Sequence, residues 1–388
     1  QQGLVQATSL GTNAQGQVVL KATDTATIQG TISADNSVGP GGSIDITAQR
    51  INVRPEAQVS ANGSTQGGRI VLWGDAQTNV HGQLSARGGS GQGGFIETST
   101  HGQLDITRAP DAGSTSGKPG TWLIDPHNIT IQATGSDTNT NGGPPPTTIG
   151  TTADSANITT GTITTALNAG TSVTIATSAG GTQAGDITVV SPISVTTPNT
   201  GPTPSLTLNA HNNININQAI TAASGGGKLD LNLNANLGGT SGTSSFNTGG
   251  AVNLNGGVLT SSTDMLLAGT GIASAVINAG AGHKLLSTGG GSISDSTINA
   301  PIQISGSTGL HNVTANGLVS FGGTGGQIVV DAGKPLTLSG GMNWSLPGSL
   351  VGTGTVVIPA GQVVQITDSG NNSSFLGDIQ LNNAGVLE

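Results

Sequence analysis

Gly41-Gly42-Ser43-Ile44-Asp45-Ile46 opens a stretch, residues 41–131, in which one pattern returns as Gly67-Gly68-Arg69-Ile70-Val71-Leu72 and Gly93-Gly94-Phe95-Ile96-Glu97-Thr98. The second glycines stand at positions 42, 68 and 94, so the same step occurs twice, and one further step reaches position 120. A fixed period in this range is typical of repeat proteins, in which each period forms one supersecondary unit. The structural repeat glycines are therefore Gly42, Gly68, Gly94 and Gly120.

The copies alternate between apolar and variable positions, which is the pattern of a strand with one buried face. The second position after each repeat glycine is apolar: Ile44, Ile70, Ile96 and Trp122. The position after it varies: Asp45, Val71, Glu97 and Leu123. Short strands repeated at this spacing form a coil that returns over itself, with neighbouring coils about 4.8 Å apart. Parallel crossovers are right-handed in nearly all proteins, so the sequence predicts an all-β, right-handed parallel β-helix (β-solenoid) with about 25 residues per coil.

The spacing divides the chain into three sections. Residues 1–132 carry regular coils with a repeat of about 26 residues. Residues 133–157 interrupt them, with Asn141-Gly142-Gly143-Pro144-Pro145-Pro146 at the centre, and because proline cannot donate a ladder hydrogen bond we expect a loop or a seam. Residues 158–388 continue the β-helix with a looser repeat.

Two local patterns stand out in the third section. Residues 162–170 leave two alternatives, a helical turn that ends at Gly170 or a threonine-rich strand. Residues 213–217 and 229–234 alternate strictly between asparagine or aspartate and aliphatic residues. We expect their asparagines to form amide-to-amide ladders between neighbouring coils.

The composition suits a narrow solenoid. Glycine accounts for 65 of 388 residues and charged residues for only 7%, against about 25% in an ordinary globular domain. The net charge is −9 and aromatic residues make up 2%, so the chain lacks both the basic stripe and the stacking aromatics of a nucleic-acid-binding protein, and we expect no nucleic acid as a partner. Cysteine is absent, which excludes a disulfide framework and a thiolate metal site. No apolar run is long enough for a membrane span.

Residues 67–131 resemble the segment just downstream of the secretion domain in filamentous-haemagglutinin-like exoproteins of two-partner secretion systems. The resemblance lies in the segments Gly68–Trp73, Gly82–Gly89, Gly93–Ser99 and Trp122–Ile131, with weaker similarity over residues 166–210. It implies export across the outer membrane of a bacterium through a β-barrel transporter partner, and an extracellular or cell-surface role as adhesin or filament. The asparagine-proline motifs of the secretion domain are missing, so we expect an internal or processed section of a longer protein.

One set of residues has the chemistry of a metal site. Asp75, His101 and His127 stand at the same offset past successive repeat glycines, so they would lie on adjacent coils if the register holds through the corner. The alternative is that they are polar corner residues in water, and we assign no cofactor. A β-helical polysaccharide lyase or hydrolase would need clustered carboxylates, but Asp45 and Glu97 are two coils apart, so we expect no catalytic residues and no enzyme.

The function expected from sequence is structural: a secreted rod at a bacterial surface. We see no capping helix, so we expect self-association through the terminal coils, head to tail, into an extracellular filament. The alternative is an adhesin that binds a glycan or a host-surface protein through the loops at residues 109–119 and 133–157.

Overall fold

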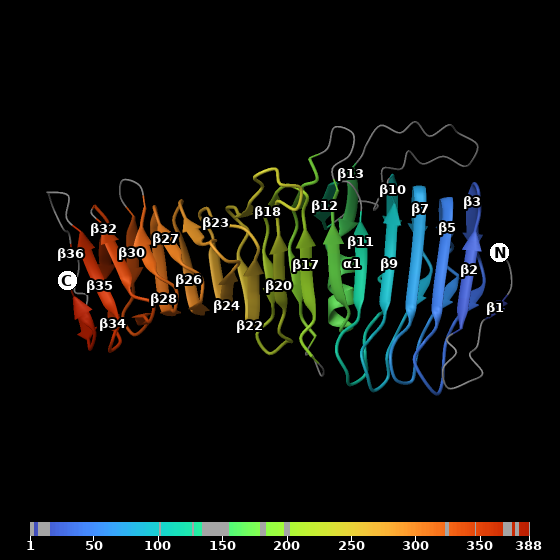
Figure 1. Ribbon diagram of the computed structural model, residues 1–388, viewed down its shortest axis with the longest axis horizontal. Coiled ribbons are helices and arrows are strands. Elements are labelled where there is room, and N and C mark those ends of the chain that lie inside the picture. Colours follow the sequence, from blue (N-terminus) through green and yellow to red (C-terminus); the bar gives the residue numbers. More distant parts are fainter. Residues whose placement is uncertain are drawn as a thin grey trace. The chain divides into compact units, whose positions relative to one another are not determined.

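The computed structural model describes residues 4–6, 16–100, 102–125, 128–133, 155–178, 184–197, 202–322, 326–345, 347–367, 375–376 and 380–387. The chain is almost entirely β-structure, and neighbouring strands pair in parallel, coil upon coil (Figure 1). The predicted parallel β-helix is therefore confirmed. The chain divides into two compact units, with the boundary near residue 212: most of residues 1–212 form unit 1 and most of residues 213–388 form unit 2.

Unit 1 has three walls, each a parallel sheet. The wall that follows the glycine pairs contains β2 (Gln17–Lys21), β5 (Ser43–Val53), β7 (Arg69–Val80), β9 (Phe95–Thr100), β11 (Thr121–Asp125), β14 (Ser172–Ala176) and β17 (Ser205–Asn209). The next wall contains β3 (Thr25–Ile28), the second halves of β5 and β7, and β10 (Gln103–Ile106). The third contains β1 (Leu4–Gln6), β4 (Thr31–Ser33), β6 (Gln58–Ser60) and β8 (Gln83–Ser85).

The core of unit 1 consists of columns of apolar side chains, one per coil. In the first wall the column runs through Val18, Ile44, Ile70, Ile96, Trp122, Val173 and Leu206, which pair in this order. Each of these side chains is buried. The regular repeat therefore places equivalent apolar residues directly above one another, as the sequence predicted.

A helix replaces strand at one level of unit 1. After β12 (Asn128–Gln132) and β13 (Ser155–Thr159), helix α1 (Thr160–Asn168) packs against β14 and β16 (Ile193–Val195), and β15 (Ile187–Val189) pairs with β12. Gly170 ends the helix at φ +78, with hydrogen bonds from Gly170 N to Leu167 O and from Thr171 N to Ala166 O, both 3.0 Å. This is a Schellman motif, so of the two alternatives the helical one is confirmed. In the described residues no helix has the length and apolarity needed to cross a membrane.

Unit 2 also consists of stacked parallel strands. One sheet contains β18 (Ile214–Ile216), β21 (Ser244–Phe246), β23 (Met265–Leu267), β25 (Leu285–Ser287), β27 (Ile302–Ile304), β29 (Val319–Phe321), β32 (Met342–Ser345), β35 (Val363–Thr367) and β38 (Val386–Leu387). The other strands are β19 (Ile220–Ala222), β20 (Asp230–Asn234), β22 (Val252–Ser261), β24 (Gly271–Ala279), β26 (Gly291–Ile298), β28 (Ser307–Ala315), β30 (Gln327–Val330), β31 (Leu336–Leu338), β33 (Ser349–Gly352), β34 (Thr355–Ile358), β36 (Phe375–Leu376) and β37 (Gln380–Asn383).

Several coils in unit 2 are shorter than the coil length expected from the sequence. In unit 2 Leu285 pairs with Ile302 and Ile302 pairs with Val319, whereas in unit 1 the strand at Ile44 pairs with the strand at Ile70. The reason lies at one corner, where single residues bend β22, β24, β26 and β28 with left-handed backbone: Asn255 (φ 51), Ser274 (φ 50), Asp295 (φ 49) and Asn312 (φ 56). A single left-handed residue turns the chain where unit 1 uses a longer corner, so the coil closes with fewer residues.

Substitution of Ser274 tests this corner. A non-glycine residue in left-handed backbone costs about 1–2 kcal/mol, and a β-branched residue is still less compatible with it. We expect Ser274→Val to lower the free energy of unfolding by about 1–2 kcal/mol, whereas Ser274→Gly leaves it unchanged or higher. Urea titration followed by circular dichroism measures both. Equal stability of the two variants would contradict the role of this corner.

Asparagine ladders are confirmed in both units. Asn247 Nδ2 donates to Asn217 Oδ1 at 2.7 Å, and the side chains of Asn278, Asn299 and Asn316 form a run of two such bonds, each 2.8 Å. In unit 1, Asn79 Nδ2 donates to Asn52 Oδ1 at 2.8 Å. Each bond joins neighbouring coils and so helps to fix their register.

Candidate functional site

The repeat glycines lie where the chain enters the first wall, and the backbone of the previous coil passes directly against them. A Cβ atom added to Gly68 would lie under 3.0 Å from the carbonyl oxygen of Gly42. The same holds for Gly94 against Gly68, and for Gly120 against Gly94. These glycines do not have positive φ, so close backbone approach is what requires the missing side chain.

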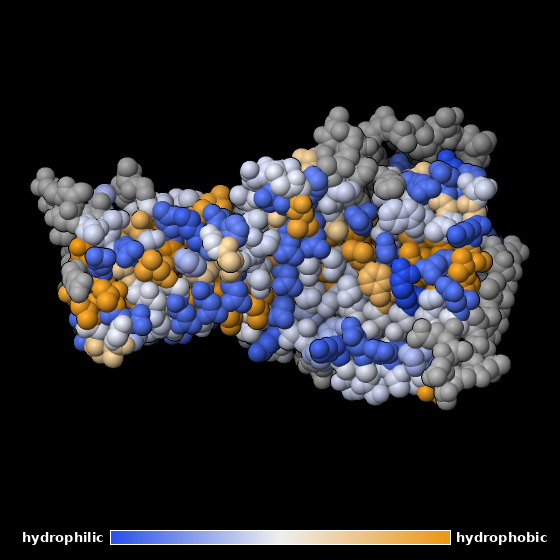
Figure 2. Space-filling model, in the orientation of Figure 1, coloured by the Kyte–Doolittle hydropathy of each residue, from blue (hydrophilic) through white to orange (hydrophobic). Residues whose placement is uncertain are grey.

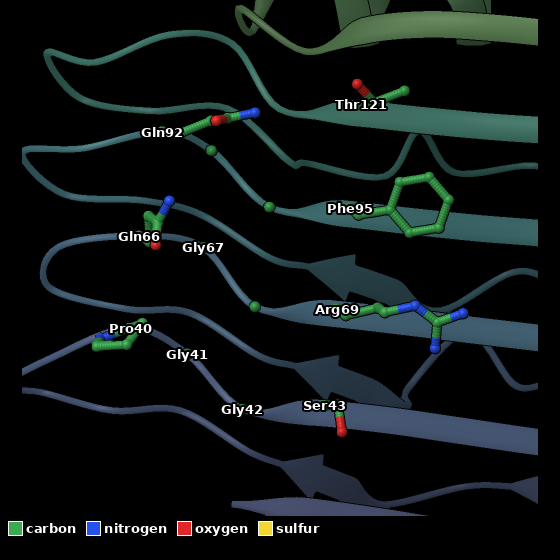
Figure 3. A pocket seen from close by; sticks show the side chains of 13 residues that line it. Pro40, Gly41, Gly42, Ser43, Gln66, Gly67, Arg69, Gln92, Phe95 and Thr121 are labelled. Carbon is green, nitrogen blue, oxygen red and sulfur yellow. The ribbon is translucent and has the colours of Figure 1, made fainter. Parts of the chain in front are cut away.

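A groove of about 390 Å³ lies over the glycine pairs of unit 1 (Figure 3). Its floor is formed by the glycine pairs at residues 41–42, 67–68 and 93–94. Figure 3 shows Pro40, Gln66 and Gln92 on the side of the connecting loops. On the opposite side, the strands carry the first residue of each wall strand: Ser43, Arg69, Phe95 and Thr121.

The strand side of the groove is held in register by the sheet. Ser43 pairs with Arg69, Arg69 with Phe95, and Phe95 with Thr121. The Arg69 guanidinium forms an ion pair with the Asp45 carboxylate, and its Cζ lies 5.8 Å from the centroid of the Phe95 ring. The ion pair and the cation–π contact together fix an aromatic ring at the edge of the groove.

The backbone of the groove is already fully engaged on its donor side. Gly42 N donates to Ala34 O, Gly68 N to Ala61 O and Gly94 N to Ala86 O, at 2.7–2.8 Å. The residue after each pair donates to the preceding coil, as Arg69 N does to Gly42 O at 2.9 Å. A ligand in the groove would therefore meet side chains and carbonyl oxygens rather than free N–H groups.

The face beside the groove mixes apolar and polar side chains (Figure 2). Val19, at 49% exposure, and the partly exposed Phe95 and Leu123 face outward from the first wall. Asp45 and Glu97 share one column with Val71 between them, as the register shows. Since Asp45 is paired with Arg69, this column does not present two free carboxylates side by side.

The metal candidate can be followed only at Asp75, because His101 and His127 lie outside the described residues. Asp75 sits in a β-bulge, where Ala48 pairs with Gly74 but Arg50 with Gln77, so that Gln49 faces two residues. Its carboxylate is exposed and accepts hydrogen bonds from Gln49 Nε2 and Trp73 Nε1, both 3.2 Å. Across the described ranges no group of three His, Cys, Asp or Glu side chains is placed to hold a metal ion.

Histidine–aspartate pairs join neighbouring coils elsewhere. His81 Nε2 lies 2.8 Å from Asp105 Oδ2, and His283 Nδ1 lies 3.2 Å from Asp264 Oδ1. Each links two coils at a corner, as the ion pair between Arg87 and Asp111 also does, with Nη1 2.7 Å from Oδ2. These pairs support the stacking of the coils.

Sequence reasoning missed the side chains along the groove. A signal was present, because Gln66 and Gln92 each precede a glycine pair, at the same place in the repeat. Their meaning depends on the residue after the pair, across the hollow that the glycines leave. Comparison of the chain with models of known protein families and with curated proteins gave no match.

Proposed function

We propose that this chain is a structural section of a secreted bacterial surface protein, in which stacked coils hold an outward face in fixed geometry. The observation that carries the proposal is the main-chain pairing of coil upon coil, with apolar columns such as Ile44, Ile70 and Ile96 inside. In a solenoid each coil contacts only its neighbours, so length can grow without a larger core. The architecture suits a spacer or scaffold.

The extracellular location and the export route are part of the same proposal. Their support is the resemblance of residues 67–131 to exoproteins that leave the cell through an outer-membrane β-barrel partner. Protease treatment of intact cells, followed by detection with an antibody against this chain, tests the location. We expect the chain to be digested on intact cells and protected when the transporter partner is deleted. Protection in both strains would contradict surface display.

Self-association is tested on the same purified protein. Negative-stain images and analytical sedimentation over a range of concentrations should show filaments if copies associate head to tail. A single monomeric species at all concentrations would contradict the filament and leave the scaffold role to be judged by the location experiment.

A second candidate is an adhesin, and the groove over the glycine pairs favours it. The groove combines an aromatic ring, a guanidinium group, amides and hydroxyls on rigid strands of one unit. Rigid strands position recognition groups better than loops do.

A further inference from the structure

Four polar side chains around the groove have no partner within the protein. In the part of the chain that the structure describes, the carboxamides of Gln66 and Gln92 and the hydroxyls of Ser43 and Thr121 make no hydrogen bond. They come from four successive coils and line one hollow, as Figure 3 shows for the labelled side chains. Unused donors and acceptors around a concave site indicate a polar ligand.

The backbone excludes one class of ligand. An added peptide strand would need free N–H and C=O groups along a sheet edge. Here the N–H groups of the glycine pairs and of Ser43, Arg69, Phe95 and Thr121 are already bonded to neighbouring coils. Recognition must therefore come from side chains, which favours a ligand with many hydroxyl or amide groups over an extended peptide.

The charge of the groove favours an uncharged ligand. Arg69 is the one charged residue in the lining, and its guanidinium is paired with Asp45. An anionic ligand would have to compete with this carboxylate. The Phe95 ring offers an apolar face of the kind that packs against the C–H groups of a sugar.

Spacing and amide chemistry narrow the class further. The lining runs from Ser43 to Thr121 across four coils, and three steps of about 4.8 Å make about 14 Å. Gln66 and Gln92 stand one coil apart on the same side, and each carboxamide offers both donors and an acceptor. An acetamido group offers the complementary N–H and C=O.

We propose that this groove binds a linear, uncharged oligosaccharide that carries acetamido groups and lies along the stack of coils. The inference builds on the adhesin alternative, yet it concerns binding alone. It is tested on purified full-length chain, so its failure is distinct from a failure of surface display or filament formation.

Isothermal titration calorimetry with chitohexaose tests the site, and cellohexaose, which lacks acetamido groups, is the matched probe. We expect saturable binding of chitohexaose and at least about fivefold weaker binding of cellohexaose, because the amide contacts are lost. Phe95→Ala should weaken chitohexaose binding about tenfold and Gln92→Ala about fivefold. Gln58→Ala, an exposed glutamine on β6 outside the groove, should bind like the unmodified chain.

Several outcomes would overturn the proposal. These are no saturable binding of chitohexaose, equal binding of the two sugars, or unchanged affinity in a Phe95→Ala variant whose circular dichroism matches that of the parent. Tighter binding of an uncharged peptide such as (Gly-Asn-Ser)₃ would assign the groove to a protein partner instead.

Discussion

Gly68→Ala is expected to be the most damaging small substitution in this protein. The added Cβ would lie under 3.0 Å from the carbonyl oxygen of Gly42, and neither backbone can move without breaking the bonds that join the coils. Overpacking of this kind commonly costs about 1–3 kcal/mol, and here the obstacle is backbone on both sides, so we expect a loss above about 3 kcal/mol. The midpoint of urea unfolding, followed by circular dichroism, measures it.

Gly161→Ala is the matched control. Gly161 lies in helix α1, where the nearest atom to an added Cβ is Thr159 Oγ1 at 4.0 Å. Alanine favours the helix over glycine by about 0.5–1 kcal/mol, so this variant should be more stable than the parent. If Gly68→Ala and Gly161→Ala unfold at the same urea concentration, close coil approach does not explain the repeat glycines.

Trp122→Ala is expected to have the second large effect. The indole is fully buried in the first wall of unit 1, and Trp122 pairs with Ile96 on one side and Val173 on the other. Its Nε1 donates to Thr98 Oγ1 at 3.0 Å. Truncation of a buried tryptophan leaves a large cavity, and we expect a loss of about 3–5 kcal/mol. Chemical denaturation measures it, with intrinsic fluorescence as a second probe.

Thr98→Val separates the hydrogen bond from the packing. Valine keeps the volume but leaves the buried indole N–H without an acceptor, which costs about 1–3 kcal/mol. The loss should therefore be smaller than that of Trp122→Ala. A Thr98→Val variant as unstable as Trp122→Ala would show that polarity, rather than volume, governs this level of the core.

The regular part of the fold could be predicted because one rule repeats there. The glycine pair and the alternating Ile44 and Ile46 define a strand and its inner face, and equal spacing then puts equivalent residues above one another. The core position of Trp122 follows from the same spacing. No comparable rule covers the short coils of unit 2.

Those coils turn at residues that sequence reasoning does not single out. Asn255, Ser274 and Asp295 have left-handed backbone, yet none of them is glycine, and serine and aspartate are also common in ordinary loops. The groove was missed for a different reason. Gln92 and Phe95 are near in sequence, but their relation is visible only when the hollow above Gly93 and Gly94 is known.

The bulge in β7 bears on how such a chain changes during evolution. At this corner two residues, Asp75 and Ala76, occupy the place of Gln49, yet pairing resumes at Gln77 and continues into the next wall. An extra residue is thus absorbed within one turn, without moving the layers on either side. Corners of this kind let a lineage lengthen or shorten single turns while the stack as a whole keeps its alignment.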